Sequence, residues 1–246
     1  MKNKMIILGA GESGIGAALL AKQKGHDVFV SDGGLIAAHF IQELEQHQIS
    51  YEQGGHDETR ILEADEVVKS PGIPEKAPIV KKIRAKKIPI ISEVEFAYRH
   101  IGGSDVVAIT GSNGKTTTTA LIYHIIKHAD KDCALVGNIG FSFARQVAMD
   151  PKSIYVAEIS SFQLDDIQSF RPKVAVLTNI TEDHLDRYEY KFENYIASKF
   201  RITQNQPSTD YFVVNQDDKV ITDHLSTHSI HAQTLFFTMN DNNTGN

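Results

Sequence analysis

The segment with the clearest capacity for chemistry is "TGSNGKTT", residues 110–117, which follows the apolar stretch "VVAI" and opens a segment of helical spacing. A Gly-rich turn between a strand and a helix presents successive backbone N–H groups and a helix N-terminus, and both favour an anion. Lys115 adds a charge for the β- and γ-phosphates, and Thr116 adds a hydroxyl that can reach Mg²⁺. The strict P-loop pattern fails because Ile109 stands in place of its first glycine. We nevertheless predict a nucleoside triphosphate site formed by Gly111, Ser112, Asn113, Gly114, Lys115, Thr116 and Thr117.

Two further residues, Glu158 and His184, are candidates to contact the metal ion or the phosphates of such a site. Glu158 ends the apolar stretch "SIYVAE", and a charge at the end of a buried strand is costly without a compensating role. The next apolar stretch, "KVAVLTNI", is followed by "TEDHLD", which contains His184. Alone, His184 is most simply a loop histidine. Placed at the same sheet edge as Lys115, Thr116 and Glu158, it becomes a candidate metal or phosphate contact.

A second Gly-rich turn, "ILGAGESGIG", lies at residues 7–16 and has the spacing Gly-x-Gly-x-x-Gly between a strand and a helix. Asp32 ends the next apolar stretch, where an acid can bind ribose hydroxyls. This is the context of a dinucleotide fingerprint, and it predicts a nucleotide site with NAD as the default ligand. The loop "KSPGIP", residues 69–74, follows a later strand and can bring backbone close to the same ligand.

The alternation of strands and helices predicts an α/β fold with mostly parallel sheets covered on both faces. With 246 residues the chain suits two domains, at about 150 residues per domain. The flexible joint is expected in "YRHIGGSD", which gives a Rossmann-like domain at 1–101 and a P-loop-type parallel or mixed α/β domain at 102–246. The predicted strands lie in "KMIILGAG", "HDVFVSD", "ADEVVKSPG", "KIPIIS", "SDVVAIT", "SIYVAEIS", "KVAVLTNI" and "DYFVVNQ".

Composition excludes several classes of protein. A net charge of −6 disfavours a nucleic-acid partner, and there is no apolar run of the length that a membrane span requires. Cys133 is the single cysteine, so there is no disulfide framework and a reducing cytoplasm fits. We expect a cytoplasmic monomer without a membrane partner. Four histidines of the first domain are expected at the surface: His26, His39, His47 and His56.

The two Gly-rich turns together restrict the class of protein more than either turn does alone. A dehydrogenase has no use for the second turn, and a simple NTPase has no use for the first. Six stretches, in order, resemble the ATP-dependent Mur ligases of bacterial peptidoglycan synthesis: "GAGESGIG", "SPGIP", "TGSNGKTT", "GNIG", "EISSFQLD" and "TNITEDHLDRY". Within that family, "SSFQLD" and "HLDRY" resemble the branch that adds D-glutamate.

The resemblance implies two ligands for the two turns. The first domain would hold the UDP of the muramoyl substrate rather than NAD, and the second would hold ATP on Lys115 and the neighbouring amides. Thr116 and Glu158 match ligands of one Mg²⁺, and His184 matches a ligand of a second Mg²⁺. The residues implied for the UDP-muramoyl substrate are Glu12, Ser13, Asp32, Gly33, Gly72, Asn138 and His184.

Lys199, in "YIASKFRI", matches the family's lysine that CO₂ converts to a carbamate, an oxygen ligand for Mg²⁺. Without the resemblance it reads as a solvated helix lysine. Carbamylation requires a neutral amine, so the resemblance implies that Lys199 is buried. Lys115, Glu158, His184 and Lys199 are thus the implied catalytic residues.

The implied reaction joins D-glutamate to UDP-N-acetylmuramoyl-L-alanine through an acyl phosphate formed with ATP. Family members are longer and have a C-terminal domain that binds the incoming amino acid. The resemblance therefore implies a fragment that binds the UDP-linked substrate, holds ATP weakly and does not ligate alone. Three alternatives remain: an NAD-dependent oxidoreductase, a UDP-sugar-binding module that has lost catalysis, and a P-loop switch protein.

Overall fold

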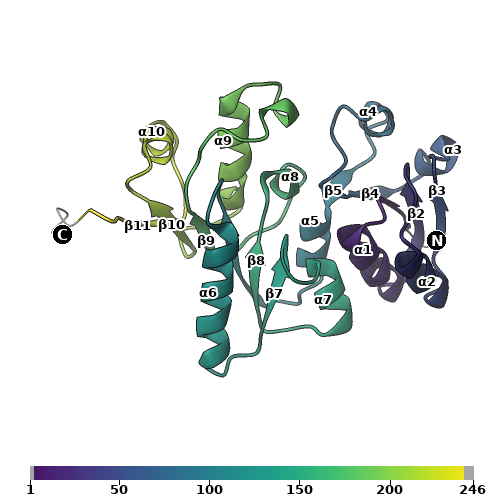
Figure 1. Ribbon diagram of the computed structural model, residues 1–246, viewed down its shortest axis with the longest axis horizontal. Coiled ribbons are helices and arrows are strands. Elements are labelled where there is room, and N and C mark those ends of the chain that lie inside the picture. The colour runs from purple at the N-terminus through teal and green to yellow at the C-terminus, as the bar shows by residue number, and fades with distance from the viewer. Residues whose placement is uncertain (1–2, 241–246) are drawn as a thin grey trace. The chain divides into compact units, whose positions relative to one another are not determined.

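The computed structural model describes residues 3–240 and separates into two compact units, each built on its own sheet (Figure 1). Unit 1 comprises Met1–Gly102, Gly140–Pro151 and Asp165–Ser169, and unit 2 comprises Gly103–Ile139, Lys152–Leu164 and Phe170–Asn246. All strand pairings are parallel, which confirms the predicted α/β class. Among residues 3–240, no helix is both long and apolar enough to cross a membrane.

Unit 1 has a five-stranded sheet in the order β3-β2-β1-β4-β5. In β1 successive side chains point to opposite faces. Ile6 and Leu8 join a core that includes residues of α3 and α4, while Met5 and Ile7 are buried on the other face. The elements are β1 (Lys4–Leu8), α1 (Glu12–Gln23), β2 (Asp27–Asp32), α2 (Ala38–Gln46), β3 (Ser50–Gln53), α3 (Glu58–Ile61), β4 (Glu66–Lys69), α4 (Pro78–Ala85), β5 (Ile90–Ser92), α5 (Glu93–Tyr98) and α7 (Phe143–Met149).

Helix α7 belongs to unit 1 because it packs on α1 and α5. A Cβ atom on Gly16 of α1 would lie 2.0 Å from the Ser142 hydroxyl oxygen, so glycine there permits the close approach. The Arg145 guanidinium donates to Glu12 over 2.7 Å and also pairs with Glu43. A second segment, 165–169, is fastened to unit 1 by Asp166, whose carboxylate pairs with Lys69 and Arg84.

Unit 2 has a six-stranded sheet in the order β11-β10-β9-β6-β8-β7. Its central strands bury Ile109, Val156 and Val176 beneath apolar residues of α6, because strands covered by helices are apolar on both faces. The elements are β6 (Asp105–Thr110), α6 (Lys115–His128), β7 (Cys133–Gly137), β8 (Ile154–Glu158), α8 (Ser161–Leu164), β9 (Val174–Leu177), a 3₁₀ turn (Leu185–Arg187), α9 (Phe192–Phe200), a 3₁₀ turn (Arg201–Thr203), β10 (Tyr211–Asn215), α10 (Lys219–Thr227) and β11 (Gln233–Phe237).

Glu93, the first residue of α5, is buried against the N-terminus of α7. Its Oε1 accepts a hydrogen bond from Ala144 N, while its Oε2 has no hydrogen-bond partner among the described residues. The pKa of Glu93 is raised to about 7, mainly because the carboxyl is buried and in part because Glu12 is near; the backbone bonds from Ala144 and Phe143 oppose the rise. The native chain therefore holds this proton at a pH where an unfolded chain releases it.

We expect Glu93 to make the protein less stable as the pH rises from about 4.5 to about 7. A folded-state pKa above the unfolded value gives stability that is present below the unfolded pKa and lost as the pH rises through the folded one. The loss over that window is about 3 kcal/mol of unfolding free energy. Urea unfolding followed by circular dichroism at several pH values measures it.

The matched control for this prediction is Glu93→Gln, which keeps the acceptor for Ala144 N and has no proton to release. The unfolding free energy of the variant relative to the parent chain should increase across the same pH window. A difference between the two proteins that does not change with pH would contradict the assignment to Glu93.

Candidate functional site

The carboxyl edge of the unit 2 sheet brings together segments that are far apart in the sequence. In the register of the sheet, Glu158 at the end of β8 lies beside Ile109 of β6 and Gly137 of β7. Thr110 at the end of β6 lies beside Leu177 of β9. The turn after β6, the residue after β7 and the loop after β9 therefore meet at one edge, as the carboxyl ends of parallel strands do.

Glu158 is the centre of this edge and is 1% exposed. Its Oε2 accepts a hydrogen bond from the Thr116 hydroxyl at 2.7 Å, and its Oε1 accepts one from Asn138 Nδ2 at 2.8 Å. A buried carboxylate needs such donors, because leaving a charge unpaired away from water is costly. The sequence prediction that Glu158 and Thr116 lie together is thus matched by a direct contact.

The Gly-rich turn is fixed by hydrogen bonds with the segment that follows β9. Asn113 N donates to Asn179 Oδ1 at 2.8 Å, and the Asn113 carbonyl accepts from Asn179 Nδ2 at 2.9 Å and from the Thr178 hydroxyl at 2.7 Å. The Ser112 hydroxyl donates to the Thr181 carbonyl and accepts from Thr181 N, each at 2.9 Å. The turn therefore holds a defined backbone conformation at the start of α6.

Two lysines converge on the carbonyl groups of this turn. Lys115 Nζ donates to the carbonyls of Gly111 and Ser112, each at 2.9 Å. Lys199 Nζ donates to the Gly111 carbonyl at 2.7 Å and lies 4.5 Å from the centroid of the Tyr195 ring. Lys199 is only 2% exposed, so the reading of it as a solvated helix lysine is wrong. The burial agrees with what the family resemblance implies.

His184 lies in the loop after β9 with its side chain half exposed. Its backbone is in the left-handed region (φ 51°), its ring lies 5.1 Å from that of Phe162, and its Nε2 lies 3.4 Å from an Asp183 oxygen. Left-handed backbone is uncommon outside glycine and often marks a functional position.

The oxygen donors of this edge suit Mg²⁺. Within residues 3–240, no group of three His, Cys, Asp or Glu side chains is placed to hold a metal ion. The predicted ligand set has only two such residues, Glu158 and His184, and depends on a hydroxyl and a modified lysine for the rest. Mg²⁺ binds through few protein oxygens together with water and phosphate, so the Thr116–Glu158 contact fits it.

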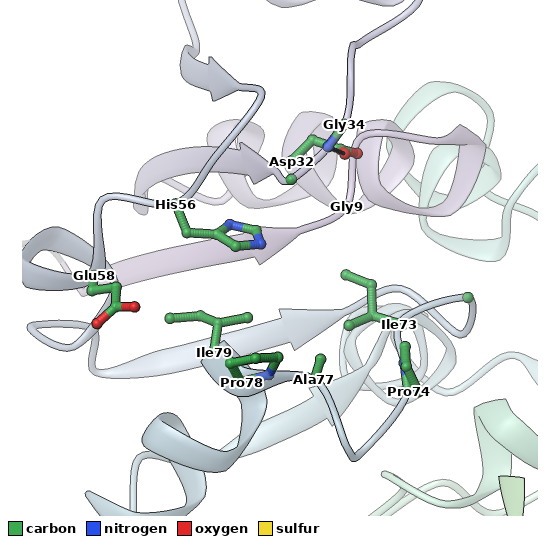
Figure 2. A pocket seen from close by; sticks show the side chains of 12 residues that line it. Gly9, Asp32, Gly34, His56, Glu58, Ile73, Pro74, Ala77, Pro78 and Ile79 are labelled. Atoms are coloured by element: carbon green, nitrogen blue, oxygen red, sulfur yellow. Dashed lines mark hydrogen bonds between the residues drawn. The ribbon is translucent and has the colours of Figure 1, made fainter.

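Unit 1 contains a pocket of about 370 Å³ at the carboxyl edge of its sheet (Figure 2). Asp32 fixes one wall: its Oδ2 accepts from Ala10 N at 2.7 Å and its Oδ1 accepts from Gly34 N at 2.8 Å. The residues that line the pocket are Gly9, Asp32, Gly33, Gly34, His56, Glu58, Gly72, Ile73, Pro74, Ala77, Pro78 and Ile79.

The pocket gathers Asp32, Gly33 and Gly72 of the predicted substrate residues. Within the described chain, Glu12 and Ser13 are not part of its lining, and the Glu12 carboxylate is held by Arg145. Asn138 lies in unit 2, where it bonds to Glu158.

Sequence reasoning missed two polar residues of this pocket, His56 and Glu58. His56 is partly exposed, as expected of a surface position, but it also lines the pocket, a role that the sequence did not indicate. The missed signal was its place directly after the Gly54–Gly55 pair, which follows β3, a strand too polar to be recognised from its residues.

Two family models match the chain. The model described as Mur ligase MurD-like, N-terminal domain, matches residues 3–92, the region where the fingerprint pattern favoured NAD. The model described as Mur ligase middle domain matches residues 109–245.

Curated relatives match nearly all of the chain. A UDP-N-acetylmuramoylalanine–D-glutamate ligase of Cytophaga hutchinsonii is 58% identical over 95% of this chain and 52% of its own length. A ligase of the same name from Christiangramia forsetii is 51% identical over 97% of this chain and 54% of its own length. The chain thus spans about half the length of these relatives.

Solved structures of lower identity share the fold. The UDP-N-acetylmuramate:L-alanyl-gamma-D-glutamyl-meso-diaminopimelate ligase from Neisseria meningitides superposes with a TM-score of 0.67 at 22% identity, covering 96% of this chain and 78% of that one. The UDP-N-acetylmuramate-alanine ligase from Thermotoga maritima gives 0.56 at 22% identity, covering 96% and 53%. Because the middle-domain model alone matches more than half of the 246 residues, the chain belongs to the Mur ligase family.

Proposed function

We propose that this chain is the substrate-binding and ATP-binding part of a cytoplasmic, monomeric ligase that adds D-glutamate to UDP-N-acetylmuramoyl-L-alanine. The observation that carries the proposal is the turn at 111–117 seated against buried Glu158, an arrangement suited to a nucleoside triphosphate. The choice of substrates is supported by the names of relatives that are 51–58% identical over nearly the whole chain.

In this proposal the amides of residues 111–117 and the Lys115 ammonium bind the ATP phosphates. Thr116 and Glu158 would hold one Mg²⁺, and His184 would contribute to a second. The ions would neutralise charge on the phosphoryl oxygens. The contribution of the chain itself is mostly positioning and electrostatics, because the turn is fixed by Asn179 and Thr181 in advance.

The chemistry has two steps. A carboxylate oxygen of the muramoyl-L-alanine attacks the γ-phosphorus of ATP, the bond to the β-phosphate oxygen breaks, and ADP leaves. The amine of D-glutamate then attacks the acyl carbon, and inorganic phosphate leaves from the tetrahedral intermediate while the nitrogen loses a proton. No side chain of this chain forms a covalent bond to the substrate.

For the UDP-linked substrate, the pocket of unit 1 supplies what a nucleotide requires. The turn at residues 9–14 leads into α1, whose N-terminus favours a phosphate. Asp32 fixes the backbone beside that turn and has remaining acceptor capacity for ribose hydroxyls. NAD would use the same features, and the match of residues 3–92 to a Mur ligase domain is what favours UDP.

The first test of this assignment is calorimetric titration of the chain with UDP-N-acetylmuramoyl-L-alanine, with NAD⁺ in a parallel cell. We expect saturable binding of the muramoyl nucleotide and no heat with NAD⁺, because residues 3–92 match the N-terminal domain of Mur ligases. Binding of NAD⁺ with no response to the muramoyl nucleotide would instead identify an oxidoreductase-type site.

A second prediction concerns Thr116, an exposed residue whose hydroxyl donates to the buried Glu158 carboxylate. Thr116→Val should lower the Mg²⁺-dependent affinity for ATP by about tenfold or more, since it loses an oxygen ligand worth at least one hydrogen bond. Saturation-transfer NMR with and without Mg²⁺ measures weak ATP binding directly. Thr116→Ser keeps the hydroxyl and should bind ATP nearly as the parent does. An equal loss of ATP affinity in both variants would show that the Thr116 hydroxyl is not a metal ligand.

A third prediction follows from the burial of Lys199. If Lys199 forms a carbamate, ¹³C-bicarbonate should give a carbamate carbonyl signal in the ¹³C NMR spectrum of the chain at mildly alkaline pH. Lys199→Met should remove the signal, and Lys115→Met, which changes the neighbouring lysine, should keep it. Retention of the signal in Lys199→Met would assign the modification to another amine.

A further inference from the structure

His56 is joined to two side chains behind the pocket wall of unit 1. Its Nδ1 lies 2.7 Å from the Ser31 hydroxyl oxygen, and that hydroxyl donates to Glu52 Oε1 over the same distance of 2.7 Å. Ser31 is fully buried in β2. Glu52 is itself fixed, because Asp57 N donates to both of its carboxylate oxygens at 2.8 and 2.9 Å.

This chain of hydrogen bonds determines which nitrogen of the His56 ring carries the proton. An ionised carboxylate only accepts, so the single proton of the Ser31 hydroxyl is committed to Glu52. The short contact to His56 then requires Nδ1–H to donate to the Ser31 oxygen. In the neutral ring the lone pair is left on Nε2, which is therefore a hydrogen-bond acceptor.

The Nε2 atom is open to the pocket because residue 33 has no side chain. A Cβ atom on Gly33 would lie 3.1 Å from His56 Nε2, so any other residue there would press against the acceptor. Across the pocket from the His56 ring lie Pro78 and Ile79, which offer an apolar surface to a flat group (Figure 2).

The pocket has a direction that places the nucleobase near His56. Gly9, in the Gly-rich turn, lies at one end, Asp32 comes next, and His56 and Glu58 lie toward the other end (Figure 2). A nucleotide with its phosphates at the turn and its ribose at Asp32 extends its base toward His56. The acceptor and the apolar wall then face the edge and the plane of the base.

We propose that His56 determines the base specificity of this pocket, with Nε2 accepting a hydrogen bond from the N3–H group of uracil. The inference rests on the proposed function, since it deepens the assignment of the pocket to a UDP-linked ligand. Cytosine carries a lone pair at N3, so it would oppose the lone pair of Nε2. Ser31 and Glu52 are positioning residues that hold the ring in the accepting form.

The test is calorimetric titration of the chain with UDP, CDP and N3-methyl-UDP, each in a separate experiment. The parent should bind UDP about tenfold or more tightly than the other two, the effect of one unmatched hydrogen bond in a partly buried site. His56→Ala should lower UDP affinity by about tenfold and leave CDP affinity unchanged, so that the preference disappears. His47→Ala, a change at an exposed histidine outside the pocket lining, should leave all three affinities as they are.

The positioning role has its own readout. Two-bond ¹H–¹⁵N NMR spectra of the His56 ring should show the Nδ1–H tautomer in the parent. Ser31→Ala removes the acceptor for Nδ1–H, so the tautomers should mix and the UDP-to-CDP preference should fall while CDP affinity stays constant. Circular dichroism checks that this buried change leaves the fold intact. Glu52→Ala, a change at a partly buried residue, removes the acceptor of the Ser31 proton and should mix the tautomers in the same way.

The outcomes separate this inference from the proposed function. Equal affinity for UDP and N3-methyl-UDP, or an Nε2–H tautomer in the parent, overturns the role of His56 while the pocket remains a UDP site. Failure of the parent to bind UDP at all overturns both.

Discussion

A buried carboxylate must be hydrogen-bonded, and in unit 2 this requirement organises the site. Glu158 lies at the end of a strand between two parallel neighbours, where water does not satisfy it. Thr116, from the helix after β6, and Asn138, from the segment after β7, satisfy one oxygen each. The same contacts align the start of α6 with the sheet edge, so the need to stabilise one charge also positions the hydroxyl and the amides that face a phosphate.

Functional residues meet at the carboxyl edge of a parallel sheet in both units of this protein. In both units the residues that carry chemistry lie at the carboxyl ends of strands: Asp32 ends β2 in unit 1, and the Gly-rich turn follows β6 in unit 2. Each is fixed in part by hydrogen bonds with a neighbouring loop: Asp32 by Ala10 N and the turn after β6 by Asn179. Rigid strands thus set the distances, and loops supply the functional groups.

Much of this architecture is readable from the sequence, because apolar runs bounded by turn residues mark buried parallel strands. All eight strands predicted from such runs are present, at β1, β2, β4, β5, β6, β8, β9 and β10. Three strands of the described residues were not predicted: β3, β7 and β11. β3 ("SYEQ") is mostly polar, so its pairing with β2 comes from tertiary context. Helix α7 likewise joins unit 1 through Gly16 and Arg145, contacts that no local pattern records.

The site residues also fall into two groups: those that local sequence predicts and those whose role depends on tertiary packing. Thr116 and Glu158 were predictable because motif spacing and the cost of a charge at a strand end act locally. His56 was not predictable, and Lys199 was predicted only through the family resemblance, because their roles depend on what packs around them. Lys199 is enclosed between Tyr195 and the Gly-rich turn, and His56 is oriented by Ser31 from a different strand. The function of such a side chain depends on neighbours that fix its protonation state or its rotamer. These neighbours are distant in sequence, so a local pattern does not reveal them. The polar side chains behind a pocket wall therefore carry as much information about ligand choice as those that line it.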